Sequence, residues 1–435
     1  MSEVKIPEGY KQTEVGIIPE DWGFDKTQNL LKITTGNKNT QDKIATGRYP
    51  FFVRSQTIEQ INSFSFDGEG VLTAGDGVGT GKIYHYVNGK FDFHQRVYLM
   101  HSFDNRIDGY YFYLYFSNNF YDRIMSMTAK SSVDSVRRIM IADMNVVLPP
   151  KQEQAAIATA LSDIDDLIGS LEKLIAKKEA IKTATMQQLL TGKTRLPEFA
   201  TREDGSAKGF KQTELELIPE DWGFDKLDSL SEVIDPHPSH RAPAEFANGI
   251  PFLGIGDINE RGEIIKSNFR KVGSYVLEEH ASRYRLGEGL IGLGRVASIG
   301  KVIIFNNALK DCTISPTLGL IRPRNINLDY LGFFLKSEFI TNQFRQVMSG
   351  STRSSVGMIV LRKLIILTPS KLEQTAIATI LSDMDSEIQA LQKRLEKTRD
   401  IKQGMMQQLL TGKVRLVSSD SPSTHPSADN SDCLA

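Results

Sequence analysis

Residues 151–196 read KQEQAAIATALSDIDDLIGSLEKLIAKKEAIKTATMQQLLTGKTRL, and residues 371–416 repeat them as KLEQTAIATILSDMDSEIQALQKRLEKTRDIKQGMMQQLLTGKVRL. Apolar residues recur in steps of four and three, a heptad stripe typical of a long helix that packs on another helix. A helix is therefore predicted at 151–192 and at 371–412, each ending at a capping glycine, Gly192 or Gly412. The predicted seam consists of Ile157, Leu161, Ile164, Ile168, Leu171 and Ile175 in the first copy and Ile377, Leu381, Met384, Ile388, Leu391 and Leu395 in the second.

Each of these stripes needs an apolar partner. A helix of about 40 residues is about 60 Å long, which exceeds the diameter of a small domain. The nearest stripe is the other copy, and because a globular segment separates the two copies, antiparallel packing is the simplest arrangement. The alternative is that each helix packs on its own globular segment.

A second repeated segment stands near the beginning of each half of the chain. KQTEVGIIPEDWGFDK at 11–26 recurs as KQTELELIPEDWGFDK at 211–226. The second copy follows the first helix through a linker, whereas the first copy begins the chain. If the two halves are equivalent, the N-terminal segment must lie near the end of the second helix, which predicts a pseudo-twofold molecule. Trp22 and Trp222, the two tryptophans of the chain, are expected to be packing anchors.

The two segments inside this frame resemble each other only faintly. Residues 68–83 (GEGVLTAGDGVGTGKI) match 287–302 (GEGLIGLGRVASIGKV), and 49–52 match 250–253. Short β-branched runs separated by Gly, Asn and Asp predict strands and turns. An aromatic helical stretch at 110–124 and at 330–348 is followed in each segment by a polar turn.

We therefore predict an α+β fold, with two α+β modules separated by two long helices that form an antiparallel coiled coil. The predicted parts are a first module at 1–150, a helix at 151–192, a linker at 193–212, a second module at 213–370, a helix at 371–412 and a tail at 413–435. The Ser/Pro/Asp composition of the tail predicts disorder.

Composition narrows the class of protein. The chain is 40% hydrophobic and 24% charged with a net charge of −1, which is ordinary for a globular protein and argues against coating nucleic acid by bulk charge. Residues 31–150 carry roughly +2 and residues 231–370 roughly +5, so any basic surface is local to the modules. The first residues, MSEVKIPEGY, lack the apolar core expected of a signal sequence, and no apolar run approaches the roughly 20 residues of a membrane span. Cys312 and Cys433 have no partner spacing, so a reducing cytoplasm is expected.

Motifs for catalysis are missing. A phosphate loop needs glycine where Asp76 stands and Ser or Thr where Ile83 stands, so the glycines are better explained as strand turns. The histidines lack metal-ligand spacing, and we expect no catalytic and no metal-binding residue in this chain. His237 and His240 are interpreted as part of a loop that touches a partner. The repeated helix carboxylates, which form either a solvated face or a docking face, are Asp163, Asp165, Asp383 and Asp385.

With the duplicated frame established, the chain resembles the DNA specificity subunit of type I restriction-modification enzymes. The motifs that carry this resemblance are TEVGIIPEDW and TELELIPEDW at 13–22 and 213–222, PPKQEQAAIATALSDID and SKLEQTAIATILSDMD at 149–165 and 370–385, and QQLLTGKTRL with QQLLTGKVRL. Each motif alone is weak, but two full copies in this order are specific. The resemblance covers nearly the whole chain except the tail.

The resemblance implies that each module is a target recognition domain for one half of a bipartite, asymmetric double-stranded DNA site. It also implies that the helices set the gap between the halves and dock two methyltransferase subunits. S-adenosylmethionine is then expected in those subunits, and ATP and magnesium in restriction and translocase subunits. This chain itself is expected to hold no cofactor.

Loop side chains that can pair with base edges or phosphates are the candidates for DNA contact. Any one of them can equally be an ordinary solvated loop residue. In the first module they are Asn37, Lys38, Arg54, Ser55, Gln56, Lys130, Ser131, Ser132, Arg137 and Arg138. In the second module they are His237, His240, Arg241, Arg295, Ser298, Thr352, Arg353, Ser354 and Ser355.

Two alternative functions compete with this interpretation. A structural coiled-coil adaptor with two protein-binding modules would show no sequence-selective DNA binding. A self-contained methyltransferase or nuclease would transfer methyl groups or cleave DNA alone, and the missing motifs disfavour it.

Overall fold

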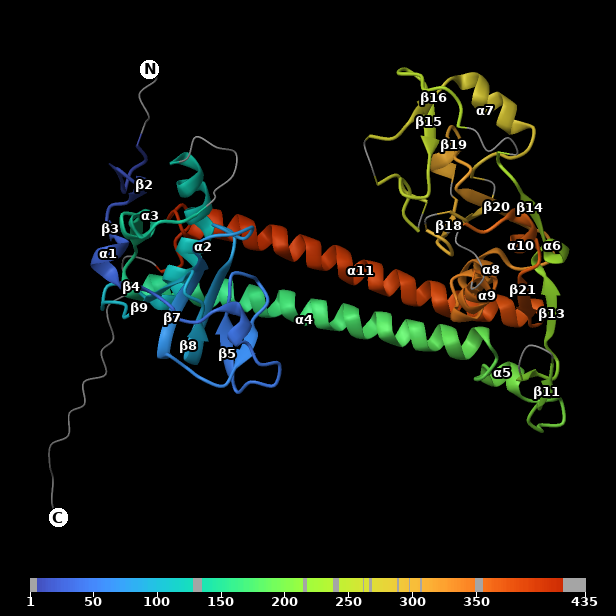
Figure 1. Ribbon diagram of the computed structural model, residues 1–435, viewed down its shortest axis with the longest axis horizontal. Coiled ribbons are helices and arrows are strands. Elements are labelled where there is room, and N and C mark those ends of the chain that lie inside the picture. The colour runs from blue at the N-terminus through green and yellow to red at the C-terminus, as the bar shows by residue number, and fades with distance from the viewer. Residues whose placement is uncertain are drawn as a thin grey trace, which may run out of the picture. The chain divides into compact units, whose positions relative to one another are not determined.

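The computed structural model describes residues 6–127, 135–213, 217–237, 242–260, 262–265, 268–287, 289–296, 298–305, 307–348 and 355–417 (Figure 1). The chain divides into two compact units. Unit 1 consists of Met1–Glu172 with Lys393–Ala435, and unit 2 is Lys173–Gln392. The long helices α4 (Lys151–Leu190) and α11 (Lys371–Leu409) each contribute residues to both units.

Unit 1 contains a six-stranded sheet in the order β4-β9-β7-β8-β5-β6. Its neighbours are antiparallel except β5 and β8, which are parallel. The strands are β4 (Lys32–Thr35), β5 (Tyr49–Phe52), β6 (Glu59–Ile61), β7 (Phe66–Ala74), β8 (Tyr84–Phe93) and β9 (Val97–His101), with a 3-10 turn, η1, at Thr40–Asp42.

The aromatic stretch of the first module forms helix α2 (Gly109–Ser126), which packs on β7 and β8. Its first turn is capped by Asp108, whose side chain accepts a hydrogen bond from the Tyr111 amide. Phe112, Phe116 and Phe120 are fully buried, and their rings stack in sequence at centroid distances of 5.4 and 4.4 Å. Burying rings of this size supplies much of the core of unit 1.

Unit 2 repeats this sheet in two pieces. A four-stranded sheet has the order β14-β20-β17-β18, and a three-stranded sheet has the order β16-β15-β19. The counterpart of β8 is broken into β18 and β19 by a 3-10 turn, η2 (Asn307–Leu309), and β15 pairs with β19 in parallel as β5 does with β8. The strands are β14 (Ser231–Ile234), β15 (Ile250–Leu253), β16 (Lys271–Val272), β17 (Ile291–Gly294), β18 (Val302–Ile304), β19 (Thr313–Ile314) and β20 (Leu318–Pro323).

The aromatic stretch of the second module differs from the single predicted run. It forms two helices, α8 (Leu328–Leu335) and α9 (Glu338–Met348), with Lys336 and Ser337 between them. Helix α7 (Ser274–Ala281) has no counterpart among the described residues of unit 1. Both modules nevertheless combine strands and helices, which confirms the predicted α+β class.

Short elements join each module to the helices. In unit 1 they are β1 (Tyr10–Thr13), β2 (Gly16–Pro19), β3 (Gly23–Lys26), α1 (Thr27–Leu30), α3 (Arg138–Ala142) and β10 (Asn145–Leu148). In unit 2 they are α5 (Pro197–Ala200), β11 (Phe210–Gln212), β12 (Leu217–Pro219), β13 (Gly223–Lys226), α6 (Leu227–Leu230), α10 (Met358–Arg362) and β21 (Ile365–Thr368). β3 pairs with β10, and β13 with β21.

The long helices run antiparallel within each unit (Figure 1). In unit 1, Lys402 and Arg399 of α11 pair with Asp165 and Glu172 of α4, at 2.6 and 2.5 Å. In unit 2, Lys182 and Lys178 of α4 pair with Asp385 and Glu387 of α11. In both units, residues later in α4 pair with residues earlier in α11, as expected of antiparallel helices.

These ion pairs also separate the repeated helix carboxylates into two that contact the other helix and two that do not. Asp165 and Asp385 make equivalent interhelical ion pairs, whereas Asp163 and Asp383 are exposed. The four carboxylates therefore do not form one continuous docking face.

All twelve predicted seam residues are buried or half-buried. Ile157 and Leu161 join the core of the first module, where Leu409 and Leu410 at the end of α11 also pack. In unit 2, Ile377 and Leu381 share a core with Leu189 and Leu190 at the end of α4. The beginning of each helix therefore packs on both its own module and the other helix, so that the two predicted arrangements coexist.

A cluster of charged side chains around Trp22 joins the N-terminal segment of unit 1 to the residues that follow α11. The buried Trp22 indole Nε1 donates to Glu153 Oε2 at 3.0 Å. Arg415 donates to the same carboxylate from Nε at 2.7 Å and to Asp21 from Nη1 at 2.9 Å. Its guanidinium lies 5.5 Å from the centre of the indole ring. The cluster joins residues 394 positions apart in the sequence and so holds the N-terminal segment beside the end of α11.

Unit 2 contains an equivalent of this cluster. Trp222 donates to Glu373 at 3.0 Å, and Arg195 donates to Glu373 at 2.6 Å and to Asp221 at 2.8 Å. Burial raises the pKa of Asp221, but hydrogen bonds from Arg195 and Lys208 outweigh this effect and lower it to about 2. Both tryptophans are at most 1% exposed, as expected of packing anchors.

Candidate nucleic-acid interface

The glycine-rich turn of the first module lies beside Ser135 and Val136, which follow the polar turn in the sequence. Asp76 forms an antiparallel bridge with Ser135, and the Val136 amide donates to the Gly75 carbonyl at 2.7 Å. The turn connects β7 to β8 and is not followed by a helix, and Gly77 has a positive φ of 90°. These features match a strand turn and not a phosphate loop.

A charged cluster surrounds this turn. Arg54 Nη1 lies 2.7 Å from Asp76 Oδ1, and Arg96 Nη1 lies 3.6 Å from Asp76 Oδ2. The Gly75 amide donates to the Arg96 carbonyl at 2.7 Å, which anchors the turn. The Arg54 and Arg96 side chains remain 41% and 65% exposed. Two guanidinium groups around one carboxylate leave a net positive site, which suits a polyanion.

The other predicted residues of the first module lie around this cluster or near it in sequence. Lys38 forms a parallel bridge with His94, next to Arg96 in the chain, and its carbonyl accepts from the Gln95 amide at 2.9 Å. Ser55, half-buried, is held through its carbonyl by His85 Nε2 at 3.1 Å. The exposed candidates are Asn37, Gln56, Arg137 and Arg138. Lys130, Ser131 and Ser132 lie outside the described residues.

The second module repeats the junction with different side chains. Val296 bridges Ser355, and the Val356 amide donates to the Arg295 carbonyl at 2.8 Å. By these contacts Arg295 corresponds to Gly75 and Val296 to Asp76, so an apolar side chain replaces the carboxylate of the first module. Ser298 and Ser355 are exposed. The remaining polar-turn candidates, Thr352, Arg353 and Ser354, lie outside the described residues, as do His240 and Arg241.

Comparison with known proteins assigns the family. The model of the type I restriction modification DNA specificity domain matches residues 19–182 and 219–398, most of the chain.

The chain belongs to the type I DNA specificity subunit family.

Relatives of this specificity subunit match it over most of their length. It is 27% identical over 436 residues to the type I restriction enzyme MjaVIII specificity subunit of Methanocaldococcus jannaschii, covering 94% of this chain and 96% of that one. It is 30% identical over 247 residues to the EcoDI specificity subunit of Escherichia coli, covering 54% of each.

Solved structures share the fold. The S subunit from M. genitalium aligns with a TM-score of 0.58 at 13% identity, covering 93% of this chain and 98% of that chain. A chain from a structure on complex assembly and conformational transition of the type I R-M system aligns at 0.52 and 13% identity, covering 91% and 99%. The two segments that the family model matches are two DNA specificity domains, as the sequence resemblance predicted.

His237 does not lie in an exposed loop, which corrects the sequence interpretation. It is 4% exposed, and its Nε2 lies 2.9 Å from the Ile314 carbonyl oxygen. Its ring packs edge-on against His280 at a centroid distance of 4.3 Å. Burial lowers the pKa of His237, so the ring is a neutral core group. Period and loop composition could not reveal this burial, because contacts far along the chain create it.

Arg295 is also less accessible than predicted. It is 7% exposed, and Asp235 Oδ2 lies 3.9 Å from its Nη1. Its Nε and Nη1 have no hydrogen-bond partner among the residues that the structure describes. Direct contact with a base edge therefore requires movement of its surroundings. Sequence did not reveal Asp76 as the partner of Arg54, because the two residues are 22 positions apart and Asp76 stands out in the sequence only as a departure from the phosphate-loop motif.

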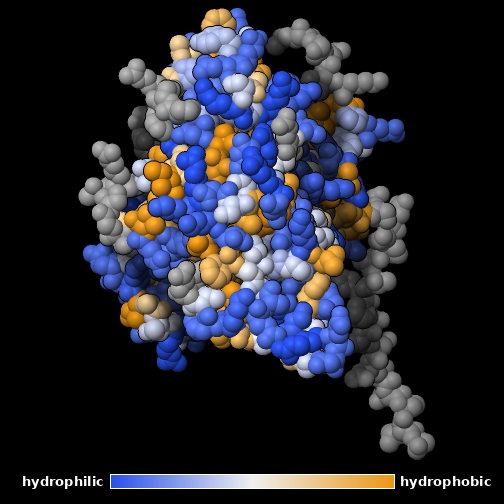
Figure 2. All heavy atoms as spheres, turned by 90° about the vertical axis from the view of Figure 1, so that its right-hand side faces the viewer, coloured by the Kyte–Doolittle hydropathy of each residue, from blue (hydrophilic) through white to orange (hydrophobic). Residues whose placement is uncertain are grey.

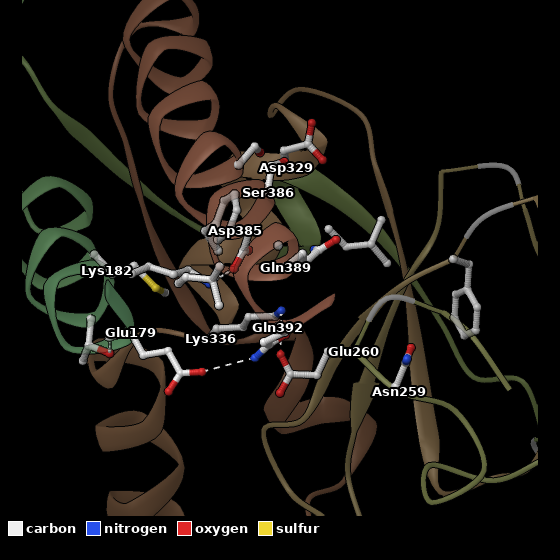
Figure 3. A pocket seen from close by; sticks show the side chains of 18 residues that line it. Glu179, Lys182, Asn259, Glu260, Asp329, Lys336, Asp385, Ser386, Gln389 and Gln392 are labelled. Atoms are coloured by element: carbon white, nitrogen blue, oxygen red, sulfur yellow. Dashed lines mark hydrogen bonds and ion pairs between the residues drawn. The ribbon is translucent and has the colours of Figure 1, made fainter. Parts of the chain in front are cut away.

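A cleft of about 980 Å³ lies in unit 2 between α4, α8 and α11 (Figure 3). Lys182 and Asp385 form an ion pair on its wall, and Lys336 Nζ lies 2.9 Å from Glu260 Oε2. Both lysines of the cleft are thus neutralised by carboxylates, which disfavours a nucleotide phosphate there. Within the described ranges, His, Cys, Asp and Glu form no metal-holding group, and no helix is long and apolar enough to cross a bilayer.

Proposed function

We propose that each recognition domain of this specificity subunit contacts one half of a bipartite, gapped site on double-stranded DNA. The observation that carries the proposal is the duplicated junction of two turns with divergent side chains. The backbone contact of Gly75 with Val136 recurs between Arg295 and Val356, so a glycine is exchanged for an arginine at this point. Asp76, which bridges Ser135, is exchanged for Val296, which bridges Ser355. A shared scaffold with different groups at the same point suits two different half-sites.

We further propose that α4 and α11 set the gap between the half-sites and dock two methyltransferase subunits. Both helices contribute residues to both units, which supports this role. S-adenosylmethionine belongs to the methyltransferase subunits in this proposal. ATP and magnesium belong to restriction and translocase subunits.

Mapping methylated adenines in the host genome, with this gene present and deleted, tests the proposal. A gapped motif should appear only when the gene is present. Methylation that ignores the deletion would refute the proposal.

The variant Arg54→Ala tests the first recognition domain. We expect the methylated motif to relax in one half only, by about 1–3 kcal/mol at one base pair, because a base-contacting arginine discriminates by that amount. Ser298→Ala, at a candidate contact of the second domain, is the matched variant and should leave unchanged the half that Arg54→Ala relaxes. A uniform loss across all sequences would instead show that Arg54 contacts phosphate.

A further inference from the structure

Both units expose apolar side chains at the same two positions. In unit 1, Met127 and Ile139 are 51% and 54% exposed. In unit 2, Val347 and Ile359 are 51% and 67% exposed. Ile139 and Ile359 are 220 positions apart, the offset of the repeated helices, and each lies in the short helix that follows the polar turn.

Met127 and Val347 also occupy equivalent positions in their helices. Met127 follows the buried Ile124 by three residues, and Val347 follows the buried Phe344 by three. We call the pair Met127 and Ile139 the unit 1 patch, and the pair Val347 and Ile359 the unit 2 patch.

Hydrogen bonds hold the helix that carries the first member of each patch near the segment that carries the second. Arg123, one helical turn before Met127, donates to the carbonyls of Met140 and Asp143 at 3.2 and 3.0 Å. This contact places the end of α2 against α3, where Ile139 lies. In unit 2, Gln343 of α9 exchanges two hydrogen bonds of 2.9 Å with the backbone of Ile365, three residues after the end of α10.

Duplication distinguishes these residues from ordinary exposed apolar groups. In the view of Figure 2, apolar side chains are scattered among hydrophilic ones, so exposure alone does not mark a binding surface. Positions that face different half-sites are expected to diverge, as Asp76 and Val296 do. Positions that face the same partner twice are expected to keep their character, as Ile139 and Ile359 do.

The chemistry of the patches favours a protein partner over DNA. Phosphates require charge or hydrogen-bond donors, which isoleucine, valine and methionine side chains lack. The core of a protein interface is apolar and enriched in such residues. Basic side chains border the patches, with Arg137 and Arg138 exposed in unit 1 and Lys363 in unit 2. The complementary surface therefore has an apolar centre and an acidic rim.

We propose that each patch docks one copy of the methyltransferase subunit through such a surface. This inference rests on the proposed function, which supplies a partner present in two copies. Each copy then contacts a recognition domain at a fixed point, at α3 in unit 1 and at α10 in unit 2. The partner would thus be seated on the domain as well as on the helices.

The complex of this subunit with its methyltransferase tests the proposal by native mass spectrometry. The wild type should bind two copies. Ile139→Asp and Ile359→Asp should each weaken one copy by at least about tenfold and leave a complex with one copy, because a charge is buried in the interface core. The double variant should bind neither copy. Ile44→Asp and Phe246→Asp, at exposed apolar positions outside the patches (40% and 58% exposed), should keep both copies.

The outcomes separate this inference from the proposed function. If the single variants keep two copies, the patches are not docking sites, and a selective loss of DNA affinity would then assign them to the DNA surface. Loss of both copies in a single variant would also overturn the inference of one patch per copy. Unchanged thermal unfolding of the variants excludes misfolding, and Ile139→Ala and Ile359→Ala should show the same loss more weakly. A wild-type complex that methylates no gapped motif would refute the proposed function instead.

Discussion

A single buried ion pair joins the beginning of α4 to the segment that follows α11. Glu153 is a carboxylate with 1% side-chain exposure, and Arg415 supplies its positive partner. Arg415→Ala should lower the free energy of unfolding by about 3 kcal/mol, because it leaves a buried charge without its counterion. Arg399→Ala is the control, since its ion pair with Glu172 is exposed and should cost less than about 1 kcal/mol. Equal losses in urea unfolding would show that the cluster does not stabilise unit 1.

Protonation of a buried histidine should make unit 2 sensitive to acid. Burial first, then repulsion between the two rings once His237 is itself protonated and the charge of Arg283, lower the pKa of His280 from 6.5 to about 4, while Glu279 partly opposes them. Between these values the unfolded chain binds a proton that the folded chain does not, so stability is lost as the pH falls through this window.

The variant His280→Asn measures that loss. An asparagine can replace the ring nitrogen Nδ1, which contacts Tyr284 at 3.0 Å, but it does not titrate. The thermal unfolding midpoint should fall less between pH 7 and pH 5 in the variant than in the wild type. Identical falls would show that His280 does not contribute to the acid sensitivity.

Each of the two long helices is followed by a glycine in the left-handed conformation that ends a helix. Gly192 and Gly412 both have φ of +69°, and a Cβ atom at either would lie 2.4 or 2.6 Å from Pro219 or Pro19. Alanine at either position should destabilise the protein by more than about 1 kcal/mol, because it adds strain and a clash. Gly404→Ala, inside α11 with open space around it, should instead stabilise by about 0.5–1 kcal/mol. Thermal unfolding of the three variants checks these opposite signs.

The helices also show where the sequence pattern was sufficient to predict an element and where it was not. The heptad stripes predicted helices that the structure begins at Lys151 and Lys371 and ends at Leu190 and Leu409. Local periodicity is sufficient there, because about eleven turns repeat the same pattern. The pattern was insufficient for residues 330–348, where the chain interrupts the helix at Lys336 and Ser337.

At the scale of the whole molecule, the proposed spacing role makes a numerical prediction. Seven residues inserted after Glu172 and seven after Gln392 would keep both heptad registers and lengthen both helices by about 10 Å. The methylated motif should keep both half-sequences and widen its gap by up to about three base pairs. Insertion of seven alanine-rich residues in the linker at 193–212 is the control and should leave the gap unchanged. An unchanged gap in the helix variant would remove the helices from this role.

Sequence by itself determined the duplicated frame, the two long helices, the α+β class and the family, because repetition and periodicity are properties of the chain alone. Tertiary structure decided which loop side chains are accessible and which converge. It buried His237 against His280 and Arg295 beside Asp235, and it brought Arg54 and Arg96 to Asp76. The physical reason is that the burial of a loop residue depends on groups distant in sequence, which local composition does not encode.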